Sequence, residues 1–276
     1  MVRGRVCTSG GRCRWFYGRP DARLRPGVGT YRGFRSTAGV RQERLVVPSG
    51  RVSLLIGFGG GMRVRGAAGR HTSLVSGLHT RSRVLGHDGD VHGVELTLVP
   101  WAAHRLFGTA SLAELADTLA DPAEVLGPRA RDLAERLAAA ATWPERFALL
   151  DETLLRWTAG DTAGPSSPVL EAWHVLERSA GSLPIREVAA VTGWSLRHLE
   201  ARFREQIGIT PKRLARILRL NRAIRELTQG TGSADTAVRC GFYDQAHLSR
   251  EFTSMTGLPP GRFLAASGGA SAWLAG

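Results

Sequence analysis

Two stretches decide how this chain folds: AAVTGWSLRHLEARF at residues 189–203 and AVRCGFYDQAHLSREF at residues 237–252. The two match at a spacing of 48 residues before a central turn and 49 residues after it, because the second turn is one residue longer. Self-similarity at a fixed period indicates a duplicated structural unit. The last third of the chain therefore carries two copies of one helical unit.

Each copy has the residue pattern of a helix-turn-helix. In the first copy Ala189 is small enough for a second helix to cross closely, and Gly193 ends the first helix in the left-handed conformation that glycine adopts at little cost. Ser195 then caps the second helix. Leu199 and Phe203 lie four residues apart on that helix and face the core. The same spacing in the second copy predicts two helix-turn-helix units in tandem.

The segment between the two copies predicts a long connecting helix over residues 211–229. Thr210 is a suitable cap, and Pro211 suits the first helical position. Arginines recur along this helix as a basic stripe, and they are Arg213, Arg216, Arg219, Arg222 and Arg225. An alternative interpretation, a duplicated helical bundle that binds protein and not DNA, stays open at this point.

Residues 169–266 resemble the DNA-binding domain of the AraC/XylS family. The resemblance rests on residues 189–211, 219–223, 240–252 and 257–260. It implies a two-headed helical fold that acts on promoters, with double-stranded DNA and RNA polymerase as partners. It also implies an N-terminal domain that senses a small-molecule effector or forms a homodimer.

The outward positions of each second helix are candidates for reading bases in successive major grooves. In the first unit these positions are Arg197, His198, Glu200, Ala201 and Arg204. In the second unit they are Gln245, Ala246, His247, Ser249 and Arg250. Candidates for phosphate contacts, which position the protein without specifying sequence, are Ser195, Lys212 and Arg213.

The chemistry of these side chains suits base edges. Arg197 can fork to guanine, Glu200 can accept from the amino group of cytosine, and Gln245 suits adenine. Net charge agrees with a polyanionic partner, since the chain carries a formal +13 and has a pI near 11.2. These features predict a sequence-specific transcription regulator, with activation as the expected sign of regulation.

Composition and periodicity divide the rest of the chain. Residues 1–35 hold nine arginines and one aspartate, and we expect a basic disordered tail there, either an arm that touches DNA backbone or extra sequence from an upstream start site. Residues 36–158 predict an α+β sensor or dimerisation domain of short strands followed by helices. Residues 159–168 read as a linker, 169–266 as the all-α tandem helix-turn-helix domain with its long connecting helix, and 267–276 as a tail.

No catalytic or metal-binding constellation is evident in the N-terminal domain. Its histidines show no metal-ligand spacing, and they are His71, His79, His87, His92 and His104. We therefore expect no enzyme activity, cofactor or metal, and the residues that would bind an effector remain unassigned. Two alternatives remain, a DNA-binding protein with an enzymatic N-terminal domain and a non-specific binder driven by charge.

The chain shows no sign of a membrane or secreted protein. It has no run of 18 apolar residues, and no apolar block follows the basic head as a secretory signal would require. Three cysteines do not make a disulfide framework in a chain of this size. We expect a cytoplasmic protein.

Overall fold

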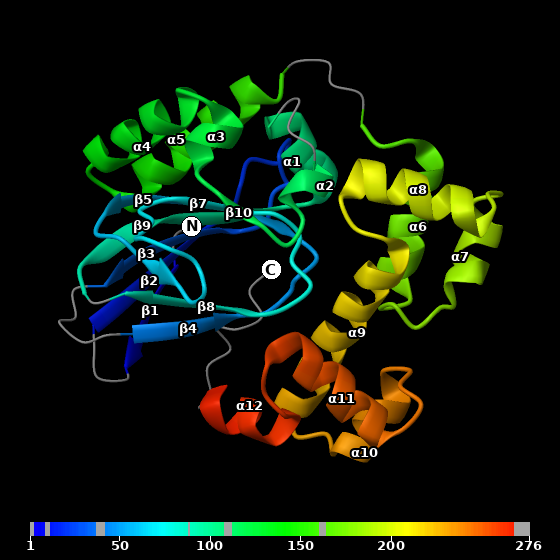
Figure 1. Cartoon of the computed structure of the whole chain (residues 1–276). Helices are drawn as coiled ribbons and strands as arrows, with labels where there is room; N and C mark the ends of the chain where they lie inside the picture. The colour runs from blue at the N-terminus through cyan, green and yellow to red at the C-terminus, as the bar shows by residue number, and fades with distance from the viewer. Residues whose placement is uncertain are drawn as a thin grey trace.

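The computed structural model describes residues 3–8, 12–36, 42–87, 89–107, 112–159 and 164–267. A β-rich N-terminal domain comes first, and an all-helical C-terminal domain follows it (Figure 1). The expected fold class is confirmed, because strands precede helices in the first part and two helix-turn-helix units joined by a long helix form the second.

The N-terminal domain is built on two antiparallel sheets. The larger has the strand order β1-β2-β3-β9-β5-β7-β10, and the smaller has the order β4-β8-β6. The strands are β1 (Arg3–Thr8), β2 (Arg12–Gly18), β3 (Tyr31–Ser36), β4 (Gln42–Val46), β5 (Val52–Gly59), β6 (Arg63–Val64), β7 (Leu74–Ser76), β8 (Arg83–His87), β9 (Val91–Leu98) and β10 (Leu119–Ala120).

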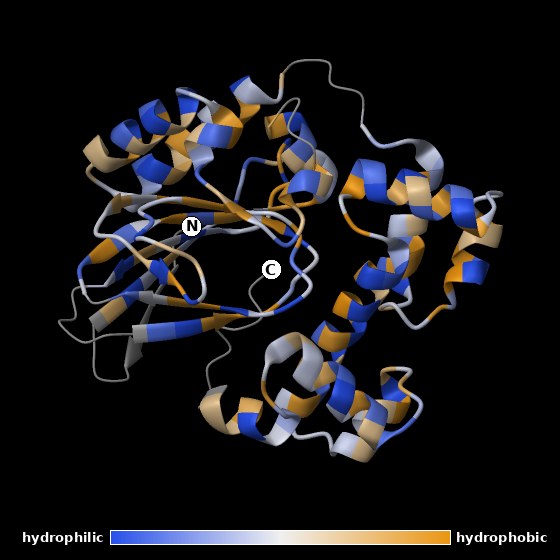
Figure 2. Ribbon diagram, in the orientation of Figure 1, coloured by the Kyte–Doolittle hydropathy of each residue, from blue (hydrophilic) through white to orange (hydrophobic). Residues whose placement is uncertain are grey.

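Helices cover the face of the large sheet that the small sheet leaves free (Figure 1). The helices of this domain are α1 (Pro100–Phe107), α2 (Leu112–Leu115), α3 (Pro122–Leu126), α4 (Arg129–Ala139) and α5 (Trp143–Trp157). Figure 2 shows α4 and α5 striped with polar and apolar residues, as expected of helices with one face on a sheet. The first turn of α5 is well formed, because Thr142 caps it and Glu145 completes the capping box.

Strand β5 explains the stacking of these layers. Successive side chains of a strand point to opposite faces of the sheet. Leu54 and Ile56 belong to the core cluster that includes Leu133 of α4, whereas Leu55 belongs to a second cluster with Val64 of β6. A strand with apolar residues on both faces must be covered on both faces, and here helices cover one and the small sheet the other.

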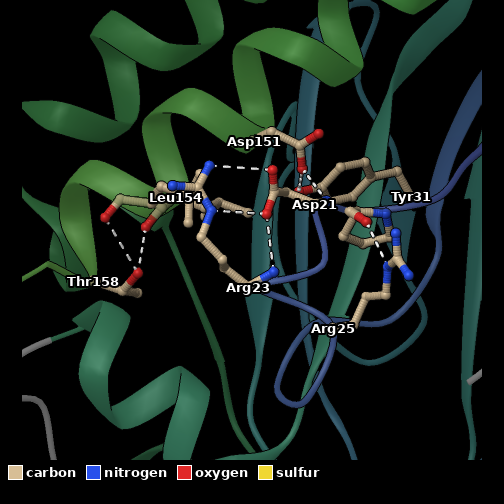
Figure 3. Close-up of polar contacts among 9 residues, drawn as sticks. Asp21, Arg23, Arg25, Tyr31, Asp151, Leu154 and Thr158 are labelled. Atoms are coloured by element: carbon tan, nitrogen blue, oxygen red, sulfur yellow. Dashed lines mark hydrogen bonds and ion pairs between the residues drawn. The ribbon is translucent and has the colours of Figure 1, made fainter.

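The expectation of a disordered tail is wrong for residues 12–35, which form two strands and the segment between them. Strand β2 pairs with β3 and with β1, and β3 pairs with β9 in the centre of the large sheet. The segment between β2 and β3 is tied to α5, because Asp151 accepts a hydrogen bond from the backbone N–H of Asp21 at 2.8 Å and from the hydroxyl of Tyr31 at 2.9 Å (Figure 3). Tyr31 is completely buried.

The glycines of this segment explain the error. Gly33 lies directly beneath the ring of Trp143 on α5, and a Cβ atom at Gly33 would overlap that ring. Gly18 meets Phe147 in the same way. Because these glycines have no side chain, the aromatic side chains of α5 pack directly on the strands. In the sequence alone, glycines spread among arginines resemble the composition of a flexible tail.

The C-terminal domain consists of helices that pack around the long connecting helix α9. Its helices are α6 (Ser167–Arg178), α7 (Ile185–Val191), α8 (Leu196–Ile207), α9 (Pro211–Thr228), α10 (Ser233–Arg239), α11 (Gln245–Thr256) and α12 (Pro260–Ser267). Figure 1 shows the α7–α8 unit at one end of α9 and the α10–α11 unit at the other. Trp173 of α6 is almost completely buried and stacks on Phe203 of α8.

The predicted linker and C-terminal tail lie partly outside the described residues. Residues 160–163 and 268–276 are not described, and α6 begins at Ser167, two residues before the predicted start of the helical domain. None of the helices in the described ranges has the length and apolar character that crossing a bilayer requires.

Candidate nucleic-acid interface

The two turns begin with the same backbone geometry. Gly193 and Gly241 both take a positive φ, 70° and 73°, where side chains other than hydrogen are disfavoured. The N–H of Trp194 donates to the carbonyl of Ala189 at 3.3 Å, and the N–H of Phe242 donates to that of Ala237 at 2.9 Å. These contacts occupy equivalent places in the two copies, so the repeat seen in the sequence is also a repeat of local structure.

A capping residue precedes the second helix of each unit. The hydroxyl of Ser195 accepts from the N–H of His198 at 3.3 Å, and the carboxylate of Asp244 accepts from the N–H of His247. Both helices end at a glycine in the left-handed conformation, Gly208 and Gly257. The recognition helices α8 and α11 are therefore bounded by the same types of residue at both ends.

The base-reading candidates of α8 lie on its solvent side. Leu199 and Phe203 are fully buried, while Glu200 is half-buried. The exposed candidates are Arg197, His198, Ala201 and Arg204. Helix α11 is arranged alike, with Leu248 and Phe252 in the core. Its candidates Gln245, Ala246 and Arg250 are exposed, and His247 and Ser249 are half-buried.

The two histidines at equivalent positions have intramolecular contacts. The ring of His198 lies edge-on to Trp194, with 4.5 Å between ring centroids. The ring of His247 lies edge-on to Phe242, and its Nδ1 accepts a hydrogen bond from the N–H of Tyr243 at 3.2 Å. Both rings thus brace the turn that precedes their helix, and this role was not evident from the sequence.

The phosphate candidates differ in their surroundings. Ser195 and Lys212 are exposed. Arg213 is exposed as well, but its guanidinium lies 3.8 Å from the carboxylate of Asp117 in the N-terminal domain. Asp117 also accepts from the backbone N–H and hydroxyl of Thr80. Arg213 therefore contacts the N-terminal domain in this arrangement.

Two arginines of the basic stripe on α9 form ion pairs within the C-terminal domain. Glu251 of α11 lies 3.1 Å from Nε of Arg216 and 3.3 Å from Arg219, and its side chain is 17% exposed. The guanidinium of Arg219 also lies over the ring of Phe242. These contacts fix the second recognition helix on the connecting helix. Sequence reasoning missed them because Glu251 lies more than 30 residues from either arginine.

The N-terminal domain contacts both helix-turn-helix units. Helix α2 packs on α8, where the carbonyl of Leu112 lies against Gly208. The N–H of Ser82 donates to the carbonyl of Met255 in α11 at 2.7 Å. Arg51 lies 3.6 Å from Glu177 of α6. One domain is thus in contact with both ends of the DNA-binding domain.

A cavity of about 210 Å³ lies between the two domains. Strands β3, β4, β5 and β9 supply one wall, and α6 and α9 supply the other. Among the described residues, the indole Nε1 of Trp173 and the Oδ1 of Asn221 are buried there without a hydrogen bond. Unsatisfied buried polar groups are rare in folded proteins, and they are groups that a bound polar molecule could satisfy.

A buried ion cluster forms the floor of this cavity. Glu95 lies 3.0 Å from Arg32 and 3.3 Å from Arg44, and Ser53 donates to it at 3.2 Å. Burial alone would raise the pKa of Glu95, but the two guanidinium groups and the hydroxyl lower it to about 2. The carboxylate is therefore charged throughout the physiological range.

Burial lowers the pKa of His79 to about 4, and the positive charge of Arg83 acts in the same direction. The unfolded chain binds a proton at this histidine below about pH 6.5, whereas the folded protein does not until about pH 4. The neutral His79 therefore makes its full contribution to the free energy of unfolding above pH 6.5, and this contribution is lost as the pH falls towards 4. Between pH 7 and 5 we expect the free energy of unfolding to fall by about 2 kcal/mol more in the wild type than in His79→Gln. Urea unfolding at both pH values measures this difference, and parallel pH profiles would contradict it.

The described residues hold no cluster of three or more potential metal ligands. The five histidines noted in the sequence are dispersed: His79 is buried beneath the cavity, His92 lies against Phe58, and His71 bonds the carbonyl of Ala68. The exposed turn-flanking residues Leu196 and Tyr243, in contrast, were not among the candidates derived from the sequence.

Residues 188–266 match a family model described as a helix-turn-helix domain. The C-terminal part of this chain is a helix-turn-helix domain. An uncharacterized HTH-type transcriptional regulator of Bacillus subtilis strain 168, YbfI, is 36% identical over 85 residues, which are 30% of this chain and 31% of the relative. The chain thus matches about a third of the length of that curated relative.

Solved structures also resemble the chain. ToxT from Vibrio cholerae, in a structure with an unsaturated fatty acid bound, is 10% identical with a TM-score of 0.47, over 90% of this chain and 96% of that one. An AraC-type transcriptional regulator from Chromobacterium violaceum is 27% identical with a TM-score of 0.34, over 38% of this chain and 94% of that one.

Proposed function

We propose that the protein is a sequence-specific DNA-binding transcription regulator that places α8 and α11 in two successive major grooves. The observation that carries this proposal is the common geometry of the two recognition helices, each capped at its start and buried along one side, with base-reading candidates on the other. Side chains of this kind at the start of a recognition helix read base edges. One chain carries both recognition helices.

The DNA contacts divide into two classes. Arg197, Glu200 and Arg250 supply hydrogen bonds to base edges, while Ser195 and Lys212 hold the phosphate backbone. In vitro selection from random duplexes, followed by footprinting, tests the proposal. A selected site with two protected segments about one helical turn apart supports it. Binding without preferred sequence, lost between low and moderate salt, would favour the non-specific alternative.

Arg197→Ala tests base reading directly. We expect the affinity for the selected site to fall by about 1–3 kcal/mol and the preference at one base pair to relax, because the guanidinium can fork to guanine. Arg202→Ala is a matched control on the same helix, since Arg202 is exposed but paired with Glu205 at 2.8 Å. Binding measurements against a panel of single-base variants distinguish the two, and an equal loss on all sequences would contradict base reading by Arg197.

We also propose that a small polar molecule binds in the cavity between the domains and changes DNA affinity. The unsatisfied groups of Trp173 and Asn221 support this proposal, as does the contact of the N-terminal domain with both helix-turn-helix units. Thermal-shift screening of small metabolites, followed by DNA binding with any that stabilise the protein, provides the test. Asn221→Leu should abolish the response, and a response that survives this variant would place the ligand elsewhere.

We expect the protein to activate transcription through RNA polymerase. In vitro transcription from a promoter with the selected site upstream tests it. An increase in transcript that depends on the site supports activation, and a decrease would indicate a repressor. Sedimentation of the protein with one site-containing duplex determines whether one chain or a homodimer binds.

A further inference from the structure

Exposed hydrophobic side chains concentrate at the two turns. Among the residues that the structure describes, the large hydrophobic side chains in the exposed class are Val191, Leu196, Val238 and Tyr243. Val191 ends α7 and Leu196 begins α8, whereas Val238 lies near the end of α10 and Tyr243 directly precedes the cap of α11. Each helix-turn-helix unit therefore presents an apolar pair, five residues apart, across its turn.

Neither Leu196 nor Tyr243 is required by the core of its unit. Leu196 is 45% exposed at the first position of α8, where the second unit has the polar residue Gln245. Tyr243 is 93% exposed and is the extra residue that makes the second turn longer, so it has no counterpart in the first unit. Only its backbone has a fold role, as the donor to His247.

The positions of Leu196 and Tyr243 indicate what they contact. Under the proposed function the starts of α8 and α11 enter the DNA grooves, so side chains exposed at these starts face the duplex. Both residues also adjoin base-reading candidates, because Leu196 precedes Arg197 and Tyr243 lies two residues before Gln245. The apolar features of a major groove are the thymine methyl groups and the sugars along its edge.

We propose that Leu196 and Tyr243 are further DNA contacts, Leu196 as a specificity-determining residue that packs on a thymine methyl group and Tyr243 as a contact to the sugar-phosphate edge of the second groove. This inference rests on the proposed function. Apolar contact with a methyl group discriminates thymine from cytosine without a hydrogen bond. The phenol of Tyr243 combines a ring face for deoxyribose with a hydroxyl that donates to a phosphate oxygen.

Replacement of single thymines by uracil, which lacks only the methyl group, tests the Leu196 contact. The probe is the selected duplex with uracil at one position at a time under the first unit. We expect one position to weaken wild-type binding about fourfold, the equivalent of one buried methyl group. In Leu196→Ala the same substitution should change affinity less than twofold, while the uracil-free site is still selected.

Tyr243→Ala and Tyr243→Phe test the second contact. We expect the alanine variant to bind the selected duplex about tenfold more weakly, with loss of protection under the second unit only, and the phenylalanine variant to lie between it and the wild type. Circular dichroism confirms that each variant is folded.

The outcomes separate this inference from the proposed function. Uniform uracil scans, or full affinity of both alanine variants on a site that the wild type still selects, would overturn the inference alone. Normal DNA binding with impaired transcription would assign the apolar pairs to a protein partner and would also overturn it. Failure of the wild type to select any sequence would overturn the proposed function, and this inference with it.

Discussion

Glu95→Ala is expected to lower the free energy of unfolding by about 3–5 kcal/mol, because it leaves two guanidinium groups buried without a counter-charge. The side chain of Arg32 is only 10% exposed, and that of Arg44 is 25% exposed. Without Glu95 neither group can regain full hydration unless the sheet opens. Urea unfolding followed by circular dichroism measures the loss.

Glu177→Ala provides the matched control for this prediction. Glu177 also pairs with an arginine, Arg51, but at 3.6 Å and with both side chains about a third exposed. We expect its removal to cost less than about 1 kcal/mol, as is usual for solvent-exposed pairs. A similar cost for the two variants would show that burial does not determine the strength of the Glu95 cluster.

Acid should weaken the Glu95 cluster only at low pH. The folded pKa is about 2, below the ordinary value of 4.5, so the contribution to stability is present above pH 4.5 and is lost as the pH falls towards 2. The pKa of His79 is also lowered in the folded protein, but its contribution to stability is lost at higher pH, between 6.5 and 4. The contributions of Glu95 and His79 to stability can therefore be distinguished by the pH range in which each is lost.

The sequence predicts local features of the DNA-binding domain well, because the signals are local. A glycine four residues after a small residue, a cap, and two apolar residues four apart lie within about 15 positions, and tertiary contacts do not alter them. The same spacing predicts that Arg197 and Gln245 lie on the solvent side of their helices. The family model matches residues 188–266, which include helices α8 to α11.

Contacts between distant residues could not be predicted in this way. Arg213, Arg216 and Arg219 read as a single basic stripe, but Asp117 binds the first and Glu251 binds the other two. In the same way, nothing near Gly33 in the sequence indicates that Trp143 packs over it. Net charge and glycine content describe composition, and they cannot show which charge is neutralised or which glycine is covered.

Gly208→Ala is the second variant with a large expected effect, and its counterpart Gly257→Ala is its control. Both glycines end a recognition helix with positive φ, 99° and 78°, so alanine at either carries a backbone cost of about 1–2 kcal/mol. The space available for a Cβ atom differs between the two glycines. A Cβ at Gly208 would lie 2.6 Å from the carbonyl oxygen of Leu112, whereas a Cβ at Gly257 meets nothing within 4 Å.

The difference between the two variants therefore measures the contact between the N-terminal domain and the first helix-turn-helix unit. We expect Gly208→Ala to cost about 1–3 kcal/mol more than Gly257→Ala, since a backbone carbonyl must move to admit the methyl group. Hydrogen exchange should accelerate at residues 112–115 in the first variant and stay unchanged there in the second. Equal unfolding free energies and equal exchange would mean that α2 does not hold α8 in solution, and the N-terminal domain would then lack this contact with the first helix-turn-helix unit.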